Sequence, residues 1–226
     1  MIILVGGEKG GTGKSTIAIN LAVMHALEKK EVLVVDADKQ GTTNFWSSLR
    51  NEYEIKPCIP CVQKFGKNIY IEIQDLAEKY ETIIIDAGGR DSAELRASLL
   101  VADKFITPIR ASQSDAWTLD HVDLLVTNAR LINENLIAMI VVNQAPTNPS
   151  VSEVSEINEY LSDFENFRIS KSIIKDRIAL RHAFKDGLGC TEFKPKDKKA
   201  ITELTSLYRE VLEECKKKKV FKDQKS

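Results

Sequence analysis

The stretch Glu8–Thr16 reads EKGGTGKST and lies between an apolar run, IILVGG (Ile2–Gly7), and a helix-like run, IAINLAVMHALEKK (Ile17–Lys30). The letters GEKGGTGKS follow the phosphate-loop pattern G-x-x-x-x-G-K-[ST], but five residues instead of four separate Gly7 from Gly13, so the first glycine of the pattern is loose. In this pattern a buried strand leads into a glycine-rich turn that opens a helix. The stretch therefore predicts an α/β fold that binds a nucleotide at its first loop.

The residue types in this loop suit the binding of phosphate groups. Glycines leave room for phosphates to approach backbone N–H groups, and the start of the following helix adds partial positive charge. Lys14 supplies a point charge to the outer phosphates, Ser15 offers its hydroxyl group to Mg²⁺, and Thr16 can reach an inner phosphate. The candidate nucleotide-binding residues of the loop are Gly10, Gly11, Thr12, Gly13, Lys14, Ser15 and Thr16.

Beyond the loop, apolar runs without alternation follow one another, as in parallel strands that are buried on both faces. The clear strand candidates are Ile2–Val5, Val32–Val35, Thr82–Ile85, Phe105–Ile109 and Ala138–Val142, and the weaker ones are Ile59–Gln63 and Arg168–Ile173. The helix candidates are Lys14–Glu28, Ile69–Lys79, Ser92–Val101, Ser114–Leu131, Val151–Leu161, Asp176–Asp186 and about Lys198–Glu214. The repeated βα order predicts one mostly parallel twisted sheet flanked by helices. We expect residues 1–215 to form a single domain and residues 216–226 a basic, flexible tail.

The composition agrees with one cytoplasmic domain. The 226 residues are 43% hydrophobic and 29% charged, which is enough for a single core. The sequence has no run of eighteen apolar residues and opens without the features of a signal peptide, so we expect a cytoplasmic protein. Cys58 and Cys61 form a close pair, CIPC, but a zinc site would need a second pair. We interpret both as ordinary reduced thiols.

Two of the predicted strands end in carboxylates. The segment VLVVDADKQG ends a strand with Asp36 and Asp38, and TIIIDAGG ends another with Asp86. Carboxylates at the C-terminal ends of parallel strands face the crevice in which ligands bind. Asp86 therefore suits the Walker B role of holding Mg²⁺.

These segments together resemble a known family. KGGTGKST with its additional lysine, Lys9, together with VVDADKQGTTNFW, IIIDAGG and ITPIRASQSDAWTLD, looks like the ParA/Min deviant-Walker ATPases over about residues 1 to 215. Within these SIMIBI-like P-loop NTPases, the chain is most similar to the short partition ATPases (ParA) that lack an N-terminal DNA-reading domain. The resemblance implies ATP and Mg²⁺ as cofactors, slow ATP hydrolysis, and a homodimer that closes on ATP.

The resemblance also implies roles for individual residues. Lys9 would reach the phosphates of ATP held by the partner chain. It would act there as an arginine finger does when a partner protein supplies it. Asp38 would orient the attacking water, which makes Lys9, Lys14 and Asp38 the catalytic candidates. Asn143, at the end of AMIVVN, lies where the family contacts adenine. The candidate metal residues are Ser15, Asp36 and Asp86.

Some positions depart from the family or remain open. By the same resemblance, the stretch after Asp38 is the first switch and Asp86–Arg90 is the second. The family often has proline where this chain has Lys39, and its second switch carries proline where this chain reads DAGGR. These departures leave the carboxylates in place but put the switch geometry and the hydrolysis rate in question. Asp115 and Trp117, in SQSDAW, match a segment near the family's dimer interface, with core packing and a helix cap as the alternative.

A basic segment near the C-terminus predicts contact with DNA. Residues 165–199 hold ten basic and five acidic residues, a net charge of +5 against −1 for the whole chain. Arg177, Arg181 and Lys185 are spaced by four and should share one helix face. A solvated amphipathic helix is the alternative, but the segment resembles the family's region that grips DNA without sequence preference. The candidate DNA-binding residues are Lys171, Lys175, Arg177, Arg181 and Lys185.

The leading functional hypothesis is an ATPase for plasmid or chromosome segregation. ATP would close the dimer, the dimer would bind the nucleoid nonspecifically, and a ParB-like centromere-binding adaptor would stimulate hydrolysis. A Min-type ATPase on a membrane is an alternative, although Val220 and Phe221 after four lysines make a thin anchor. A relative that positions a protein cargo is another. An iron–sulfur relative would need matching cysteines, which neither Cys190 nor the CIPC pair provides.

Overall fold

A computed structural model describes residues 1–111, 118–148, 157 and 160–223, and in them the strands form one sheet. The strands are β1 (Ile2–Val5), β2 (Val32–Ala37), β3 (Cys61–Gln63), β4 (Thr82–Ala87), β5 (Lys104–Ile109), β6 (Ile137–Val142) and β7 (Phe167–Ile169). Their order is β3-β2-β4-β1-β5-β6-β7, and each neighbouring pair is parallel. The predicted parallel sheet is therefore confirmed.

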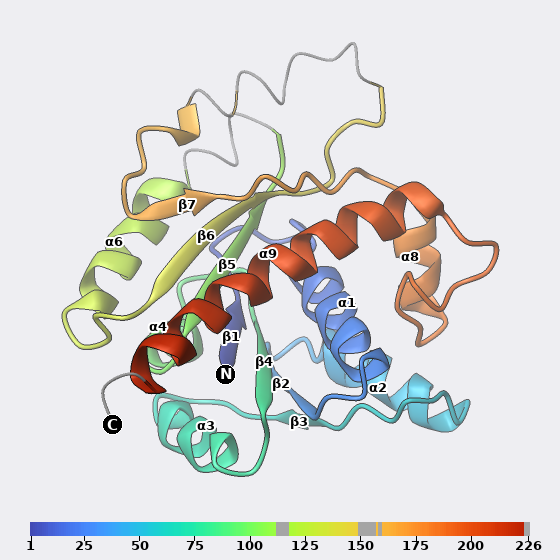
Figure 1. Ribbon diagram of the computed structural model, residues 1–226, viewed down its shortest axis with the longest axis horizontal. Helices are drawn as coiled ribbons and strands as arrows, with labels where there is room; N and C mark the ends of the chain where they lie inside the picture. The colour runs from blue at the N-terminus through green and yellow to red at the C-terminus, as the bar shows by residue number, and fades with distance from the viewer. Residues whose placement is uncertain (112–117, 149–156, 158–159, 224–226) are drawn as a thin grey trace.

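Helices cover both faces of this sheet (Figure 1). They are α1 (Lys14–Leu27), α2 (Thr42–Glu52), α3 (Ile69–Ala77), α4 (Ala93–Leu99), α6 (Leu119–Arg130), α8 (Ile178–Lys185) and α9 (Lys198–Asp223). Buried residues of α3, α4 and α6 pack on one face, and those of α1, α2, α8 and α9 on the other. The result is the three-layer arrangement in which parallel strands are buried on both sides.

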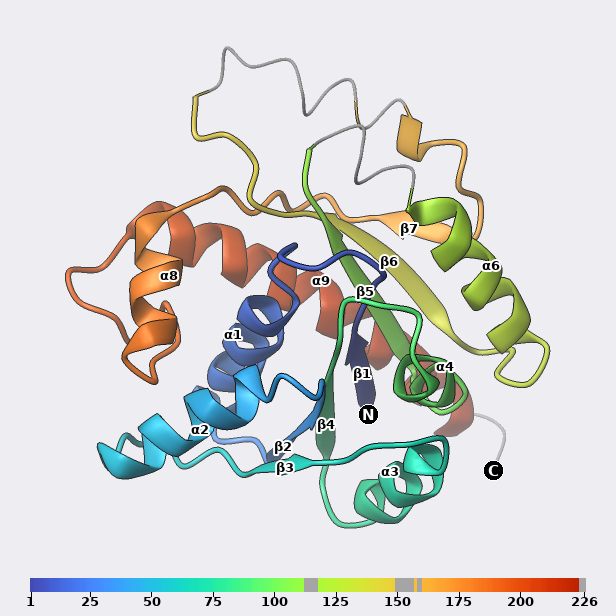
Figure 2. The ribbon, with the colours of Figure 1, turned by 180° about the vertical axis from the view of Figure 1, so that it is seen from behind.

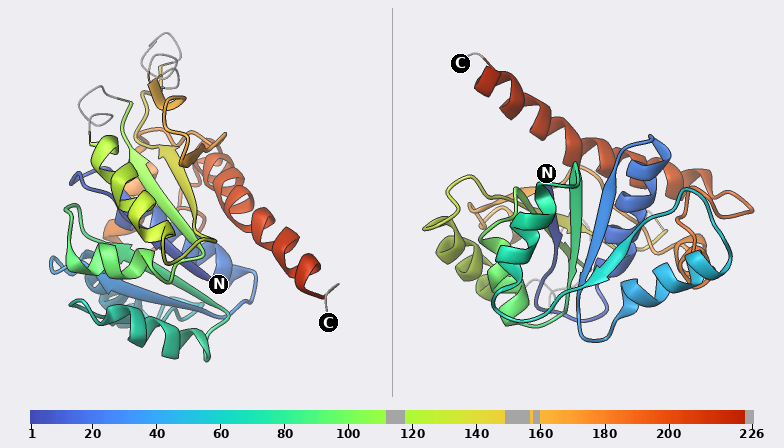
Figure 3. Two further views of the ribbon diagram at one scale, coloured as in Figure 1. Left: turned by 90° about the vertical axis from the view of Figure 1, so that its left-hand side faces the viewer. Right: turned by 90° about the horizontal axis from the view of Figure 1, so that it is seen from below.

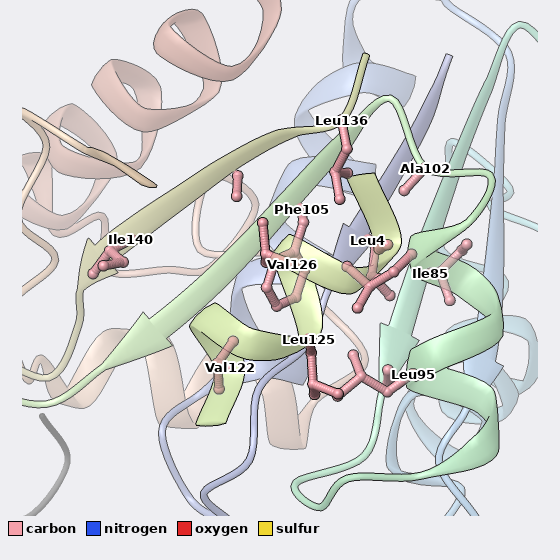
Figure 4. Close-up of a cluster of buried hydrophobic side chains, with 14 of the residues drawn as sticks. Leu4, Ile85, Leu95, Ala102, Phe105, Val122, Leu125, Val126, Leu136 and Ile140 are labelled. Carbon is pink, nitrogen blue, oxygen red and sulfur yellow. The ribbon is translucent and has the colours of Figure 1, made fainter. Parts of the chain in front are cut away.

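Alternating residues of each central strand supply the two halves of the core. In β1, Leu4 belongs to the cluster under α4 and α6, whereas Ile3 and Val5 belong to the cluster under α1 and α9. Figure 4 shows the first cluster, in which Leu4 lies with Phe105 and Val126. Because successive side chains of a strand point to opposite faces, an unbroken apolar run fills both layers.

Helix α2 was not predicted. Its sequence, TTNFWSSLRNE, is rich in residues that favour turns over helix interiors. Its buried residues are Thr43, Trp46, Ser47 and Arg50, so the inward face is largely polar and shows little apolar periodicity. Gly41, with φ +66°, starts the helix at the end of the loop that follows β2. The helix thus forms through tertiary contacts and not through a hydrophobic stripe.

The C-terminal helix is longer than expected. It continues to Asp223, through most of the stretch predicted as a flexible tail, and its far end extends away from the sheet (Figure 3). The flexibility of that stretch stays a prediction. Most of the predicted helix Val151–Leu161 lies outside the described residues. Among the described helices, none is both long enough and apolar enough to span a membrane.

Candidate nucleotide-binding site

The phosphate loop joins the end of β1 to the start of α1 (Figure 2). Gly13 caps the helix with φ +86°, and a Cβ atom there would lie 2.2 Å from Nδ2 of Asn143. The Asn143 amide donates to the carbonyl oxygen of Thr12 at 2.7 Å. The backbone conformation and the missing space both require glycine, so the loop closes tightly over the helix start, where N–H groups bind phosphate.

Two residues that the sequence analysis missed hold the outer part of the loop. Arg110, directly after β5, donates to the carbonyl oxygen of Gly11 at 2.6 Å and to Oε1 of Gln144 at 2.7 Å. Gln144 follows Asn143 at the end of β6 and lines the cleft. Because these contacts join segments far apart in the chain, no local pattern indicated them.

Lys14 lies inside the loop as the motif predicts. Its side chain is 7% exposed, and Nζ donates to the carbonyl oxygen of Lys9 at 2.8 Å. Burial lowers the pKa of Lys14, while the carboxylates of Asp86 and Asp38 oppose that shift. These two carboxylates lie near enough to act on the ammonium group, so the structure brings the predicted catalytic lysine and both switch carboxylates together.

Asp86 forms the centre of an oxygen-rich site. The hydroxyl of Thr43 donates to Oδ2 of Asp86 at 2.5 Å, and Ser15 makes a second side-chain hydrogen bond to it. Burial raises the pKa of the Asp86 carboxyl to about 7, against the effect of those hydrogen bonds. Thr43 was missed because it stands in the unpredicted helix α2, although the letters QGTT after Asp38 could have indicated it.

This donor set fits Mg²⁺. Ser15, Thr43 and Asp86 present hard oxygen atoms at one point, and Mg²⁺ is commonly held by one or two carboxylates with substrate phosphates and water. In the part of the chain that the structure describes, no cage of three or more His, Cys, Asp or Glu side chains exists. Beside the oxygen atoms of these side chains, a Mg²⁺ ion at this site would take phosphate oxygens and water.

The two carboxylates after β2 have different surroundings. Asp36 is fully buried and accepts the backbone N–H groups of Asp38 at 3.0 Å and Asn44 at 2.7 Å. Burial raises the pKa of Asp36, while the backbone hydrogen bonds lower it. Asp38 is half-buried, lines the cleft and accepts the N–H of Gln40 at 3.0 Å. Asp36 thus shapes the first switch loop, and Asp38 faces the site.

A cleft of about 1010 Å³ opens between the phosphate loop and the loops after β2 and β4. Its walls include Gly10–Gly11, Gly13–Thr16, Ala37–Gln40, Gly88–Ser92 and Glu94. Arg181 and Phe184 of α8 and Gln144 form part of its rim. A volume of this size suits a nucleotide.

The predicted DNA-binding residues differ in exposure and in their partners. Arg177 is half-buried, and its guanidinium binds Glu203 of α9 at 2.6 Å. Arg181 pairs with Asp176 at 3.0 Å and lines the nucleotide cleft. Lys171 and Lys185 are exposed, and Lys175 is half-buried. The predicted shared helix face is wrong for Arg177, which precedes α8 in extended backbone.

Other predicted positions remain untested. Asn143 is 3% exposed and its amide is engaged by the phosphate loop, so the adenine role stays a prediction. Asp115 and Trp117 lie outside the described residues.

The fold and the cleft define a P-loop nucleotide-binding protein. Residues 3–189 match the model of the CobQ/CobB/MinD/ParA nucleotide binding domain, and the chain belongs to this family. The resemblance to ParA/Min ATPases is therefore confirmed at the level of the family.

The relatives within the family are named for different cellular processes. The maintenance of carboxysome distribution protein A of Halothiobacillus neapolitanus is 22% identical over 93% of this chain and 95% of its own. A plasmid partition protein from Borrelia burgdorferi B31 bound to AMPPNP has a TM-score of 0.72, with 21% identity over 94% of this chain and 98% of its own. The septum site-determining protein MinD of Pyrococcus horikoshii, complexed with Mg-ADP, has a TM-score of 0.70, with 17% identity over 93% and 95%. These related structures hold an ATP analogue in one case and ADP with Mg²⁺ in the other, in agreement with the expected nucleotide and metal.

Proposed function

We propose that this chain is a Mg²⁺-dependent ATP hydrolase that closes into a homodimer around ATP. The observation that carries the proposal is the phosphate loop with its two lysines. Lys14 is buried in the loop, and Lys9 is half-buried and accepts a hydrogen bond from the Lys14 ammonium at its carbonyl oxygen. A second lysine on the outer turn of the loop is the feature that ParA-type ATPases use across the dimer.

The residues around the cleft divide the work of hydrolysis. Backbone N–H groups of the loop and the Lys14 ammonium bind the phosphates and fix their position in the cleft. Asp38 orients the attacking water, because it is the cleft-facing carboxylate of the first switch loop. Asp36 keeps that loop in place through its two backbone hydrogen bonds. Mg²⁺, held at Asp86, Ser15 and Thr43, would neutralise phosphate charge.

The cargo that we propose is DNA, engaged with no sequence preference on the nucleoid. Lys171 and Lys185 are exposed cations near the C-terminal part of the chain, and neither has a base-reading motif beside it. A ParB-like adaptor would bring the centromere and stimulate hydrolysis, which supports segregation of a plasmid or chromosome.

A second candidate is positioning of a protein cargo. It is favoured by the 22% identical relative named for carboxysome distribution, which aligns over 93% of this chain. Both functions use the same ATP site, so they differ in the adaptor and not in the catalytic residues.

The test of ATP-dependent dimerisation is light scattering after size-exclusion chromatography, with ATP or ADP. We expect a dimer with ATP and a monomer with ADP for the wild type and for the control Lys67→Ala, an exposed lysine outside the cleft. Lys9→Ala should bind nucleotide but stay monomeric and lose hydrolysis. If Lys9→Ala dimerises and hydrolyses ATP like the wild type, the trans-acting lysine is refuted.

DNA binding is tested by measuring the affinity for a nonspecific duplex over a series of salt concentrations. A Lys171→Glu, Lys185→Glu double variant should lower DNA affinity and reduce the salt slope by about 0.9 for each lost phosphate contact. Unchanged DNA binding would refute this surface. ATP-dependent sedimentation with anionic liposomes, but not with DNA, would favour the Min-type alternative.

A further inference from the structure

The second switch loop lies on the phosphate loop at a distance that only glycine allows. A Cβ atom on Gly89 would lie 2.9 Å from the backbone N and Cα of Gly10 and 2.9 Å from Nζ of Lys14. One on Gly88 would lie 3.2 Å from the Asp38 carboxyl carbon. The side chains could swing away, but the backbone of Gly10 could not. The sequence DAGGR therefore brings the two loops into direct contact.

Both ends of this loop are anchored. Asp86, at the end of β4, is held by the hydroxyl of Thr43. At the other end Asp91 accepts a hydrogen bond from Arg96 at 2.6 Å and lies 3.5 Å from Nε2 of His121. Nδ1 of the same imidazole lies 3.2 Å from the Glu8 carboxylate in the phosphate loop. The short segment between these anchors, which contains Arg90, is thus confined to the edge of the cleft.

Arg90 differs from the other cations that line the cleft. Lys14 donates to a backbone carbonyl, Arg181 pairs with Asp176, and Lys39 interacts electrostatically with Glu94. Arg90 is exposed and lines the cleft, and within the described residues it has no hydrogen bond or ion pair. An exposed guanidinium with no acidic partner, beside a site for phosphates, is arranged to bind an anion in two-point fashion.

We propose that Arg90 binds the terminal phosphate of a nucleoside triphosphate held by its own chain, and so makes the site prefer the triphosphate over the diphosphate. The proposal rests on the proposed function, since it needs the cleft to bind ATP. A Cβ atom on Gly89 would lie 2.9 Å from the Lys14 ammonium, the group that reaches the outer phosphates in this kind of loop, so the next residue lies near the outer end of the phosphate chain. The inner phosphates are served by the loop and the start of α1.

The test compares binding of AMPPNP and ADP, each with Mg²⁺, by isothermal titration of the full chain. A hydrogen bond between charged groups at a partly exposed site changes affinity roughly tenfold. We expect Arg90→Gln to weaken AMPPNP binding by about that factor and ADP binding by less than about twofold. Arg90→Lys should keep part of the preference. The matched control is Arg209→Gln, an exposed arginine on α9 that does not line the cleft.

Titrations are made in the Lys9→Ala background as well, so that the loss is measured without the proposed dimer. A loss in both backgrounds that is specific to AMPPNP supports a contact in cis. An equal effect on AMPPNP and ADP, or none on either, overturns the role of Arg90 while leaving the ATPase proposal intact. A wild-type chain that binds neither nucleotide would overturn both.

Discussion

Replacing Asp86 with Asn is expected to stabilise the protein when Mg²⁺ and nucleotide are absent. The side chain is 1% exposed, and burial raises the pKa of its carboxyl from 3.8 to about 7. The native state at higher pH must therefore keep a buried charge, and about three pKa units correspond to about 4 kcal/mol of unfolding free energy. Asn keeps the size of the side chain and an oxygen that accepts from Thr43.

The pH dependence fixes the sign of this effect. Between pH 3.8 and about 7 the native state holds a proton that the unfolded chain has released, so wild-type stability falls as the pH rises through this window. The stability of the Asn variant does not fall in this window. The difference in unfolding free energy between the variant and the wild type should therefore grow from almost nothing near pH 4 to its full value above pH 7.

The assay is thermal and urea unfolding of both proteins in EDTA at a series of pH values. For a domain of this size 1 kcal/mol moves Tm by about 2–4 °C, so the variant should melt roughly 10 °C higher at about pH 8. With saturating Mg²⁺ and AMPPNP the wild type should gain stability and the variant should gain less. A variant no more stable than the wild type in EDTA at about pH 8 would refute the buried-charge argument.

Three further perturbations test other parts of the structure. Gly13→Ala should abolish nucleotide binding in an equilibrium titration, because the added Cβ would meet Asn143 at 2.2 Å in a left-handed backbone. His25 is 3% exposed and burial lowers its pKa below 6.5, so wild-type stability should fall as the pH drops below about 6.5; His25→Gln should flatten that fall in urea titrations. Arg50→Leu should lower the unfolding free energy by about 3–5 kcal/mol, because it strips Glu192 of a buried ion pair, and the added Glu192→Leu should restore part of the loss.

The sheet could be predicted because its signal is local. Each central strand is a short apolar run buried on both faces, and β1 has the predicted bounds, Ile2–Val5. The edge strand β7 differs more, since Phe167–Ile169 replaces the predicted Arg168–Ile173. Residues beyond Ile169 are held by side chains of α9; for example, Glu210 accepts the backbone N–H of Lys171. Such distant partners cannot be recognised from the residues next to the strand.

In the phosphate site, the residues that belong to a sequence motif were predicted. Lys14 and Ser15 are where the loop pattern places them, and Asp86 lies beside both. Thr43 could not be placed so easily, because its role depends on a hydroxyl from α2 reaching across to the end of β4. The site is therefore completed by tertiary contact between two switch segments, and sequence spacing identifies only the members that follow a strand.

The basic segment shows why a charge pattern alone is a weak guide to a surface. A spacing of four places side chains on one face only where all of them are helical, and Arg177 stands before the first residue of α8. From there its guanidinium reaches Glu203 at 2.6 Å and lies 3.8 Å from Asp197, both acids from distant sequence. Glu in place of Arg177 would add a third carboxylate to that pair, so this change would perturb the packing of α9. Charge reversal at the exposed Lys171 and Lys185 is the sharper test of DNA binding, since it alters the surface without removing a buried partner.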